Sequence, residues 1–231
     1  MVNGAVTIAR DEGAAAERLL ALSYAPVAAR AGATALFALD DLLGQILRTT
    51  REPVVGQMRL TWWHEALTRL DSAPPPAEPV LRALAAEVLP RGVSGARLAG
   101  MIDAWEMLLD ADTPDDATLA GYAARGVILF EALGTVLGVP PDDPVAPAGR
   151  GWALADLARH VGDAAVASRA GAMAGPALAV ATAATWSRNG RTLGALAHLA
   201  RLDLAVPPGQ PIRRGAPRRV ARLIYHRISG R

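Results

Sequence analysis

Three side chains in the second half of the chain have the types and the spacing of a metal site. Asp156, His160 and Asp163 are separated by four and then three positions, so one helix would carry them on one face. Carboxylate and imidazole groups are common metal ligands. The alternative, which we favour, is the remnant of a polar cavity, because no second acidic cluster is expected to face these residues.

The acids Asp40 and Asp41 form a second candidate group. On a helix, Asp41 would share a face with residues one turn later, which would allow it to act as a displaced metal ligand. The alternative, which we favour, is that both carboxylates are solvated or ion-paired. His64, His198 and His226 stand alone in the sequence, and we expect surface or capping roles for them.

The sequence offers no motif for other kinds of catalysis. The chain has no cysteine, which excludes disulfides, zinc–thiolate sites and cysteine nucleophiles. It has no glycine-rich phosphate loop after a strand, no HExxH helix and no G-x-S-x-G turn. We therefore expect no cofactor, unless the carboxylates named above hold Mg²⁺.

The charge of the chain is unevenly distributed. All 24 basic residues are arginine, and seven of them lie between Arg213 and Arg231, where there is no acid. The remaining 17 arginines face 22 acids, which leaves a net charge of −5 before the tail. Because Tyr225 is the only aromatic residue of the tail, we do not expect it to bind nucleic acid.

The elements that carry these side chains are expected to be helices. Apolar residues recur at helical rather than alternating spacing from end to end of the 231-residue chain. This pattern predicts an all-α fold: a single-domain helical bundle over 1–206, then a Pro/Gly linker and a basic C-terminal helix within 207–231. Proline and glycine punctuation places helices at about 12–22, 26–48, 53–72, 80–89, 96–109, 118–137, 147–169 and 175–200.

Two segments bear on membranes. The uncharged segment 170–187 has the length of a membrane span, but its alanine and glycine content favours a buried helix of a soluble domain. The tail can form an amphipathic helix, with an apolar stripe and flanking arginines that would suit an anionic membrane surface: Val220, Leu223, Ile224 and Ile228, with Arg219, Arg222 and Arg227. The alternative is a helix docked on the domain. Asp11 and Glu12 come too early for a signal peptide, so we expect a cytoplasmic protein, peripheral on the inner face of the membrane if the tail binds there.

Four segments in order along the chain carry further motifs: Ala35–Leu39 (ALFAL), Gly56–Leu67 (GQMRLTWWHEAL), Ile102–Glu106 (IDAWE) and Gly151–Arg159 (GWALADLAR). They resemble the squalene/phytoene synthase family, in which an ALYAF helix, a W-[WR]-x-x-x-L helix, an IDARE helix and a GxAxQLTNILRD helix follow one another. The similarity spans about residues 19–169. It implies a helical bundle of the isoprenoid synthase type.

The resemblance also implies a chemistry whose acidic residues are mostly missing from the expected positions of this chain. The family needs two facing acidic clusters, because magnesium ions neutralise the departing diphosphate. The first cluster, of the type DDxxD, maps to Gly44, Gln45 and Arg48, none of which is acidic. In the second cluster, the asparagine and two aspartates of the family map to Asp156, His160 and Ala164, so one acid remains.

In that second motif, His160 and Ala164 stand where the family has its aspartates, and Asp163 is a further carboxylate. The resemblance places the helix of Arg48 opposite the helix of Asp156. We therefore predict that Arg48 approaches Asp156 or Asp163 and replaces the metal-bridged contact by an ion pair.

These comparisons lead to a non-catalytic hypothesis. Gly56–Trp63 resembles the branch of the family that includes a mitochondrial complex I assembly factor, which lacks the synthase aspartates. The chain would then act by binding a protein partner or an isoprenoid-like lipid, with the old prenyl cavity reused or filled. The specific form of this hypothesis is a role in respiratory-complex assembly. Lining residues for that cavity would be Gly44, Gln45, Arg48, Arg59, Trp63, Asp156, Arg159 and His160. The alternative is a prenyl transferase that joins two isoprenoid diphosphates, with shifted magnesium ligands: Asp40, Asp41, Asp156 and Asp163.

Overall fold

The computed structural model describes residues 12–49, 52–109, 111 and 113–231. This part of the chain forms ten α-helices and two short 3-10 helices and contains no strand, which confirms the predicted all-α fold. In chain order the elements are α1 (Glu12–Leu22), η1 (Val27–Ala29), α2 (Arg30–Thr49), α3 (Pro53–Arg69), α4 (Pro79–Glu87), η2 (Leu89–Arg91), α5 (Gly95–Leu109), α6 (Asp116–Leu137), α7 (Val145–His160), α8 (Ala164–Ala183), α9 (Arg191–Leu204) and α10 (Pro217–Ser229).

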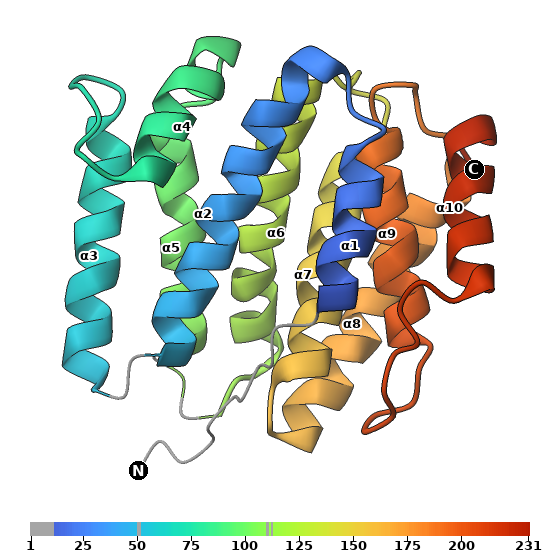
Figure 1. Ribbon diagram of the computed structural model, residues 1–231. Helices are drawn as coiled ribbons and strands as arrows, with labels where there is room; N and C mark the ends of the chain where they lie inside the picture. Colours follow the sequence, from blue (N-terminus) through green and yellow to red (C-terminus); the bar gives the residue numbers. More distant parts are fainter. Residues whose placement is uncertain (1–11, 50–51, 110, 112) are drawn as a thin grey trace.

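The helices stand side by side as a bundle, with α3 at one edge and α10 at the other (Figure 1). α6 packs against α5, α7 and α2. α7 also packs against α8 and α9, and α10 packs on α9. The helices α6 and α7 therefore form the centre of the bundle.

The backbones of α6 and α7 touch at two glycines. A Cβ atom on Gly126 would lie 2.1 Å from the carbonyl oxygen of Gly149, and a Cβ atom on Gly149 would lie 2.2 Å from the carbonyl oxygen of Gly126. Only glycine leaves room for this approach, because interiors are close-packed. The contact sets the spacing between α7 and Arg125, which immediately precedes Gly126 on α6.

The helix predicted over 147–169 is wrong in its extent. α7 ends at His160, and α8 begins after Asp163. The Asp163 carboxylate accepts hydrogen bonds from the backbone N–H groups of Ala165 at 2.8 Å and Val166 at 3.1 Å. This is an N-cap, which starts a new helix in a new direction.

The helix predicted over 175–200 is also wrong, because two helices share this segment. α8 continues through Pro176 and ends at Ala183. In the break that follows, Trp186 is 2% exposed and its indole N–H donates to the carbonyl oxygen of Ala181 at 2.8 Å. A buried tryptophan thus fixes a break that helical periodicity does not reveal.

Among the described residues, α6 and α8 are long and apolar enough to cross a membrane by length and composition. Those two properties do not separate a membrane span from a core helix. Only 28% of the apolar stretch of α8 is buried, so α8 is a surface helix with one packed face. The prediction that segment 170–187 is buried is therefore wrong.

Charged side chains fasten α10 and the preceding linker to α1 and α9. Glu17 of α1 accepts hydrogen bonds from the Arg219 guanidinium at 2.7 and 2.6 Å and from the Gly215 N–H at 2.9 Å. Asp203 of α9 pairs with Arg219 and with Arg214, each at 2.7 Å. Burial opposes ionisation of Glu17, but the hydrogen bonds and charge of Arg219 outweigh it and lower the pKa of Glu17. We call these four charged side chains the Glu17 network.

Two arginines of the tail do not flank an outer apolar stripe, as the sequence led us to expect. Arg219 is buried in the Glu17 network. The Arg222 guanidinium turns inward, and its Nη2 lies 2.8 Å from Nε2 of His198. Leu223 is fully buried and belongs to the core rather than to an exposed stripe.

His198 and His226 are also buried, which contradicts the surface or capping roles expected for them. Their rings meet edge to face with centroids 4.9 Å apart. Burial, together with the positive charges of Arg222 and Arg201, lowers the pKa of His198 to about 3. Burial also lowers the pKa of His226. Both histidines are therefore neutral in the folded protein at neutral pH.

Acidification below pH 6.5, the ordinary histidine pKa, is expected to destabilise the protein. In this range the unfolded chain binds protons at His198 and His226 that the folded chain does not, so stability present above pH 6.5 is lost as the pH falls. The expected loss is about 1.4 kcal/mol per pH unit for each histidine that stays neutral when folded. Urea denaturation at several pH values measures it.

Replacing His198 by glutamine should reduce this pH dependence, because the variant has no buried imidazole at this position. Stability that is flat from pH 6.5 down to the range where carboxylates titrate, near 4.5, would contradict the burial of neutral histidines.

Candidate functional site

A buried arginine in the middle of the bundle joins acids from two other helices. Arg125 of α6 donates from Nε and Nη2 to the two carboxylate oxygens of Asp40 on α2, each at 2.7 Å. Its Nη1 lies 3.4 Å from Oδ2 of Asp156 on α7. The side chains of Arg125 and Asp40 are 4% and 5% exposed. A single guanidinium thus bridges α2 and α7.

Aromatic rings enclose this guanidinium. The Arg125 Cζ atom lies 4.5 Å from the ring centroid of Trp105, 5.0 Å from that of Trp152 and 5.6 Å from that of Tyr122. The Tyr122 hydroxyl also receives a hydrogen bond from Nη1. The ring of Trp152 in turn packs against Phe37 of α2. The three rings around the guanidinium thus come from α5, α6 and α7. A flat guanidinium suits this environment, because it can stack on aromatic rings and pair with carboxylates at the same time.

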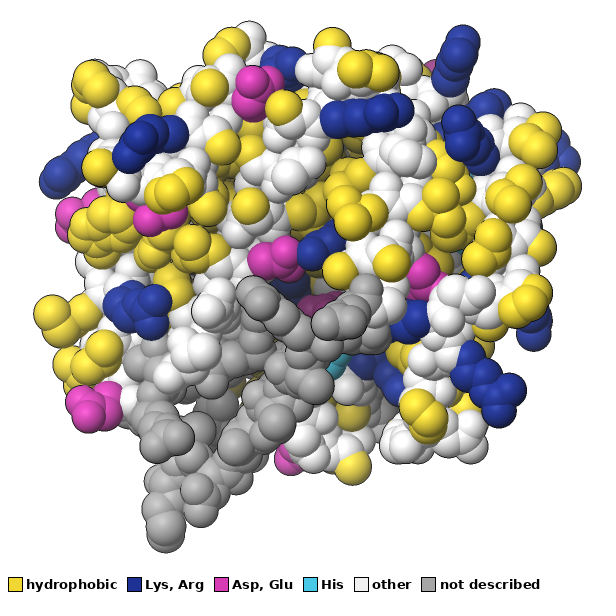
Figure 2. Space-filling model, viewed as in Figure 1, with side chains coloured by type: hydrophobic (Ala, Val, Ile, Leu, Met, Phe, Trp, Pro, Cys, Tyr) yellow, Lys and Arg dark blue, Asp and Glu magenta, His cyan; other side chains and the backbone are white. Residues whose placement is uncertain are grey.

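A second arginine covers the site from α1. Arg18 donates to both carboxylate oxygens of Asp41, at 2.8 and 2.6 Å, and the charges of Asp41, Asp40 and Asp156 raise its pKa against the effect of burial. The Asp41 side chain is 54% exposed, whereas that of Asp40 is 5% exposed and pairs with Arg125 of α6. Figure 2 shows acidic and basic side chains meeting in the middle of this face, between α1 and α2. Asp40, rather than Asp41, is the inward-facing acid.

On α7, Asp156 has a further partner one turn later. Nδ1 of His160 lies 3.1 Å from Oδ1 of Asp156 and 2.8 Å from its backbone oxygen. Burial would raise the pKa of Asp156, but the His160 contact and the Arg125 charge outweigh it and lower this pKa to about 2. The Asp156 side chain is 35% exposed, so it lies at the rim of the site rather than in its depth. We call Arg125, Asp40, Asp156, Arg18, Asp41 and His160 the Arg125 cluster.

The sequence predicted a possible ligand triad that the structure does not assemble. Asp163 lies beyond the end of α7, and its carboxylate caps α8. It therefore does not share a helix face with Asp156 and His160. Within the described residues, no group of three or more histidine or acidic side chains is placed to hold a metal ion.

The positions to which the sequence analysis assigned the first family motif lie on α2, one to two turns after Asp40. Gly44 is buried and Gln45 is exposed. The side chain of Arg48 lies outside the described residues, and so does the predicted contact between Arg48 and Asp156. The structure has Arg125 in an equivalent role, since it pairs with acids of both α2 and α7.

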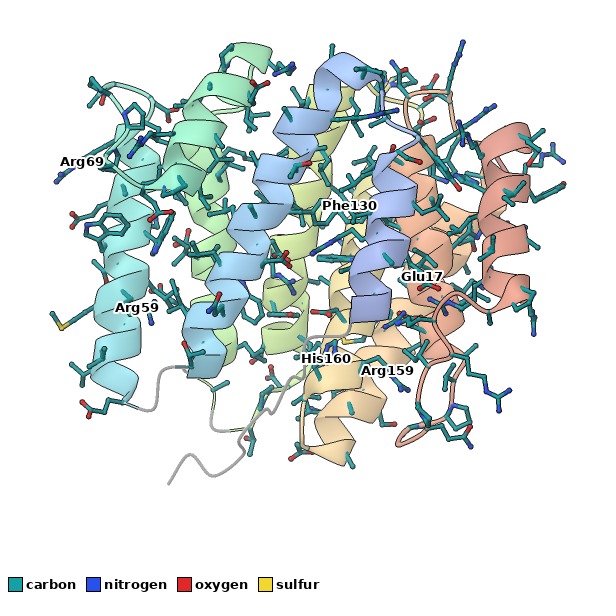
Figure 3. All side chains as sticks on the ribbon, viewed as in Figure 1. Glu17, Arg59, Arg69, Phe130, Arg159 and His160 are labelled. Atoms are coloured by element: carbon teal, nitrogen blue, oxygen red, sulfur yellow. The ribbon has the colours of Figure 1, made fainter. Side chains whose placement is uncertain are left out.

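The other predicted cavity residues lie apart from the Arg125 cluster. Arg59 is exposed on α3 at one edge of the bundle, whereas His160 lies near its middle (Figure 3). Trp63 is 6% exposed and packs in the core, whereas the adjacent Trp62 is 48% exposed. Arg159 donates at 3.1 Å to the carbonyl oxygen of Val206 and at 2.8 Å to that of Gln210, which fastens the linker before α10. These three residues are not brought together.

Sequence reasoning missed Arg125, Arg18 and the aromatic rings around them. A signal was present: Arg125 is the only basic residue of α6, a helix that is otherwise largely apolar. A lone arginine in such a helix must find a counter-ion when it is buried. The identity of that counter-ion depends on which helices lie beside α6, which one sequence does not state.

This arrangement does not fit a magnesium–diphosphate site. Magnesium prefers about six oxygen ligands and draws one or two carboxylates from the protein. Both oxygens of Asp40 are hydrogen-bonded to Arg125, and Asp156 is shared between Arg125 and His160. A magnesium ion between α2 and α7 would be repelled by the positive charge of the buried Arg125 guanidinium.

The all-α bundle of the described residues agrees with the isoprenoid synthase fold, which is the fold of the family that the sequence matches. The sequence matches the squalene/phytoene synthase family over residues 12–183. The chain therefore belongs to that family, and the family resemblance seen in its motifs is confirmed. No curated protein and no solved structure matches it.

Proposed function

We propose that this family member acts by binding rather than by joining isoprenoid diphosphates. The observation that carries the proposal is the position of Arg125, whose guanidinium pairs with Asp40 and Asp156 between α2 and α7. The family chemistry requires positive charge at this place to come from magnesium and to act on a diphosphate. Here a side chain supplies the charge permanently and occupies both acids.

Electrostatics supports the same proposal. The desolvated Arg125 has a pKa well above its usual value, because Asp40 stabilises the cation against the effect of burial. It therefore stays charged. A magnesium ion placed about 4 Å from a guanidinium would meet a repulsion of roughly 1–4 kcal/mol per unit of charge, depending on exposure to solvent. We expect no resident metal or other cofactor.

The partner in our proposal is a protein or an isoprenoid-like lipid. The resemblance of Gly56–Trp63 to the complex I assembly branch makes respiratory-complex assembly the specific version of the protein hypothesis. Two side chains of this segment, Met58 and Trp62, are 68% and 48% exposed on α3. Such side chains are typical of protein contacts, which supports the protein hypothesis.

A thermal-shift experiment tests the proposal. Millimolar magnesium with a non-hydrolysable farnesyl diphosphate analogue is expected to raise the melting temperature little, because Arg125 and its partners leave no place for the metal. The melting temperature of a catalytic synthase of the family, measured in parallel, should rise by several degrees, because a ligand that binds the folded state stabilises it.

Two other outcomes are informative. A large shift that requires magnesium would mean that Asp40, Asp41, Asp156 and Asp163 rearrange into a site, and the prenyl transferase alternative would replace this proposal. A shift produced by the analogue without magnesium would favour the lipid as the ligand over a protein partner.

A further inference from the structure

The outer face of α10 carries an apolar stripe whose side chains are at least half exposed. Ile224, Tyr225 and Ile228 are 50%, 53% and 73% exposed, whereas Leu223 and His226 on the opposite face are buried against the bundle. The helix is thus docked and also presents apolar side chains outward. α10 is the outermost helix at one edge of the bundle, where a flat surface can reach it (Figure 1).

The arginines of the tail divide into two groups. Arg214, Arg219 and Arg222 turn inward, to the Glu17 network and His198. The other four are exposed, and there is no acid anywhere in this segment: Arg213, Arg218, Arg227 and Arg231. The acids Glu17 and Asp203 pair with Arg214 and Arg219, and among the described residues no ion pair links either acid to an exposed arginine of the tail. The outer face of the tail keeps its positive charge.

The exposed arginines stand on both sides of the stripe. At about 100° per residue, Arg218 falls roughly 80° to one side of Ile228 and Arg227 falls roughly 60° to the other side of Ile224. Arg227 is held over the ring of Tyr24, with its Cζ 5.1 Å from the ring centroid. Figure 2 shows hydrophobic and basic side chains together at the edge of the molecule where α10 lies.

We propose that the outer face of α10 binds an anionic membrane surface, with Ile224 and Ile228 between the headgroups and Arg218 and Arg227 on the lipid phosphates. A short apolar stripe with arginines along both sides suits an interface that is apolar below and negative above. Tyr225 suits the headgroup level, where amphipathic rings gather. This inference goes beyond the proposed function, since it concerns a surface at the edge of the bundle and not the Arg125 cluster.

Vesicle flotation with the full chain tests the inference. Wild-type protein should float with vesicles that contain phosphatidylglycerol and should not float with pure phosphatidylcholine, and high salt should weaken the binding. The double variants Ile224→Ser with Ile228→Ser and Arg218→Gln with Arg227→Gln should each weaken binding by about tenfold or more. Their circular dichroism melting curves should match the wild type, because all four side chains are exposed.

The matched control is Val54→Ser with Val180→Ser, which removes exposed apolar side chains from α3 and α8. This control should bind vesicles as the wild type does. Equal binding to both lipid compositions, binding that the α10 variants leave unchanged, or no binding at all would each overturn the proposal. Capture by polyglutamate without vesicle binding would also overturn it and assign α10 to an acidic protein. None of these results depends on the thermal-shift experiment.

Discussion

Replacing Arg125 by methionine is expected to lower the free energy of unfolding by about 3–5 kcal/mol. The change leaves the Asp40 carboxylate, which is 5% exposed, without its two hydrogen bonds in the middle of the bundle. Breaking a buried pair from one side is costly because the remaining charge stays desolvated. Urea denaturation followed by circular dichroism gives the difference.

Two matched variants separate this effect from a general loss of arginine. Arg97→Met removes a side chain that is 55% exposed and pairs with Glu131. This change should lower the free energy of unfolding by only about 0–1 kcal/mol. Arg125→Met combined with Asp40→Leu should recover much of the loss, because both charges are then replaced by apolar groups. An Arg125→Met variant as stable as Arg97→Met would show that the buried pair does not organise the centre of the bundle.

The second large effect is expected at Glu17. Changing Glu17 to leucine removes the acid that accepts two hydrogen bonds from Arg219 and one from the Gly215 N–H. Asp203 alone then faces two arginines, and we expect a loss of about 3 kcal/mol in the free energy of unfolding. Because this network holds the tail on α1 and α9, trypsin should also cleave the linker before α10 faster than in the wild type.

Glu65→Leu serves as the control for this change. The Glu65 side chain is 58% exposed and lies 3.5 Å from Arg69 on the same helix. Its removal should therefore lower the free energy of unfolding by only about 0–1 kcal/mol. It should leave the rate of trypsin cleavage in the linker unchanged. If Glu17→Leu and Glu65→Leu behave alike in both measurements, α10 is not held by the Glu17 network.

Most helix positions could be predicted from the sequence, because proline and glycine mark their ends. The helix over 12–22 was predicted at its observed bounds. The two helix breaks that the sequence did not predict lie at 161–163 and 184–190. At both places a side-chain contact, rather than a run of proline or glycine, ends one helix and allows the next to begin. In the first, the Asp163 cap starts a new helix, and in the second a buried Trp186 holds the break.

The candidate site could be predicted only in part. Motif positions pointed to Asp156 and His160 on α7, and Asp40 on α2 was a candidate only together with Asp41, because both precede the first motif. The groups that complete the cluster, Arg125 and Arg18, come from α6 and α1, and their role depends on how four helices pack. Likewise, a single sequence does not distinguish a buried neutral histidine such as His198 from an exposed one.

The proposal of a non-catalytic protein is tested most directly by turnover. Purified protein is incubated with farnesyl or geranylgeranyl diphosphate and magnesium, and released pyrophosphate is measured, with a catalytic family member in parallel. We predict no release above the background without protein, and no difference between the wild type and Asp156→Ala. Clear pyrophosphate release that Asp156→Ala abolishes would contradict the account, because Asp156 would then serve catalysis rather than pair with Arg125.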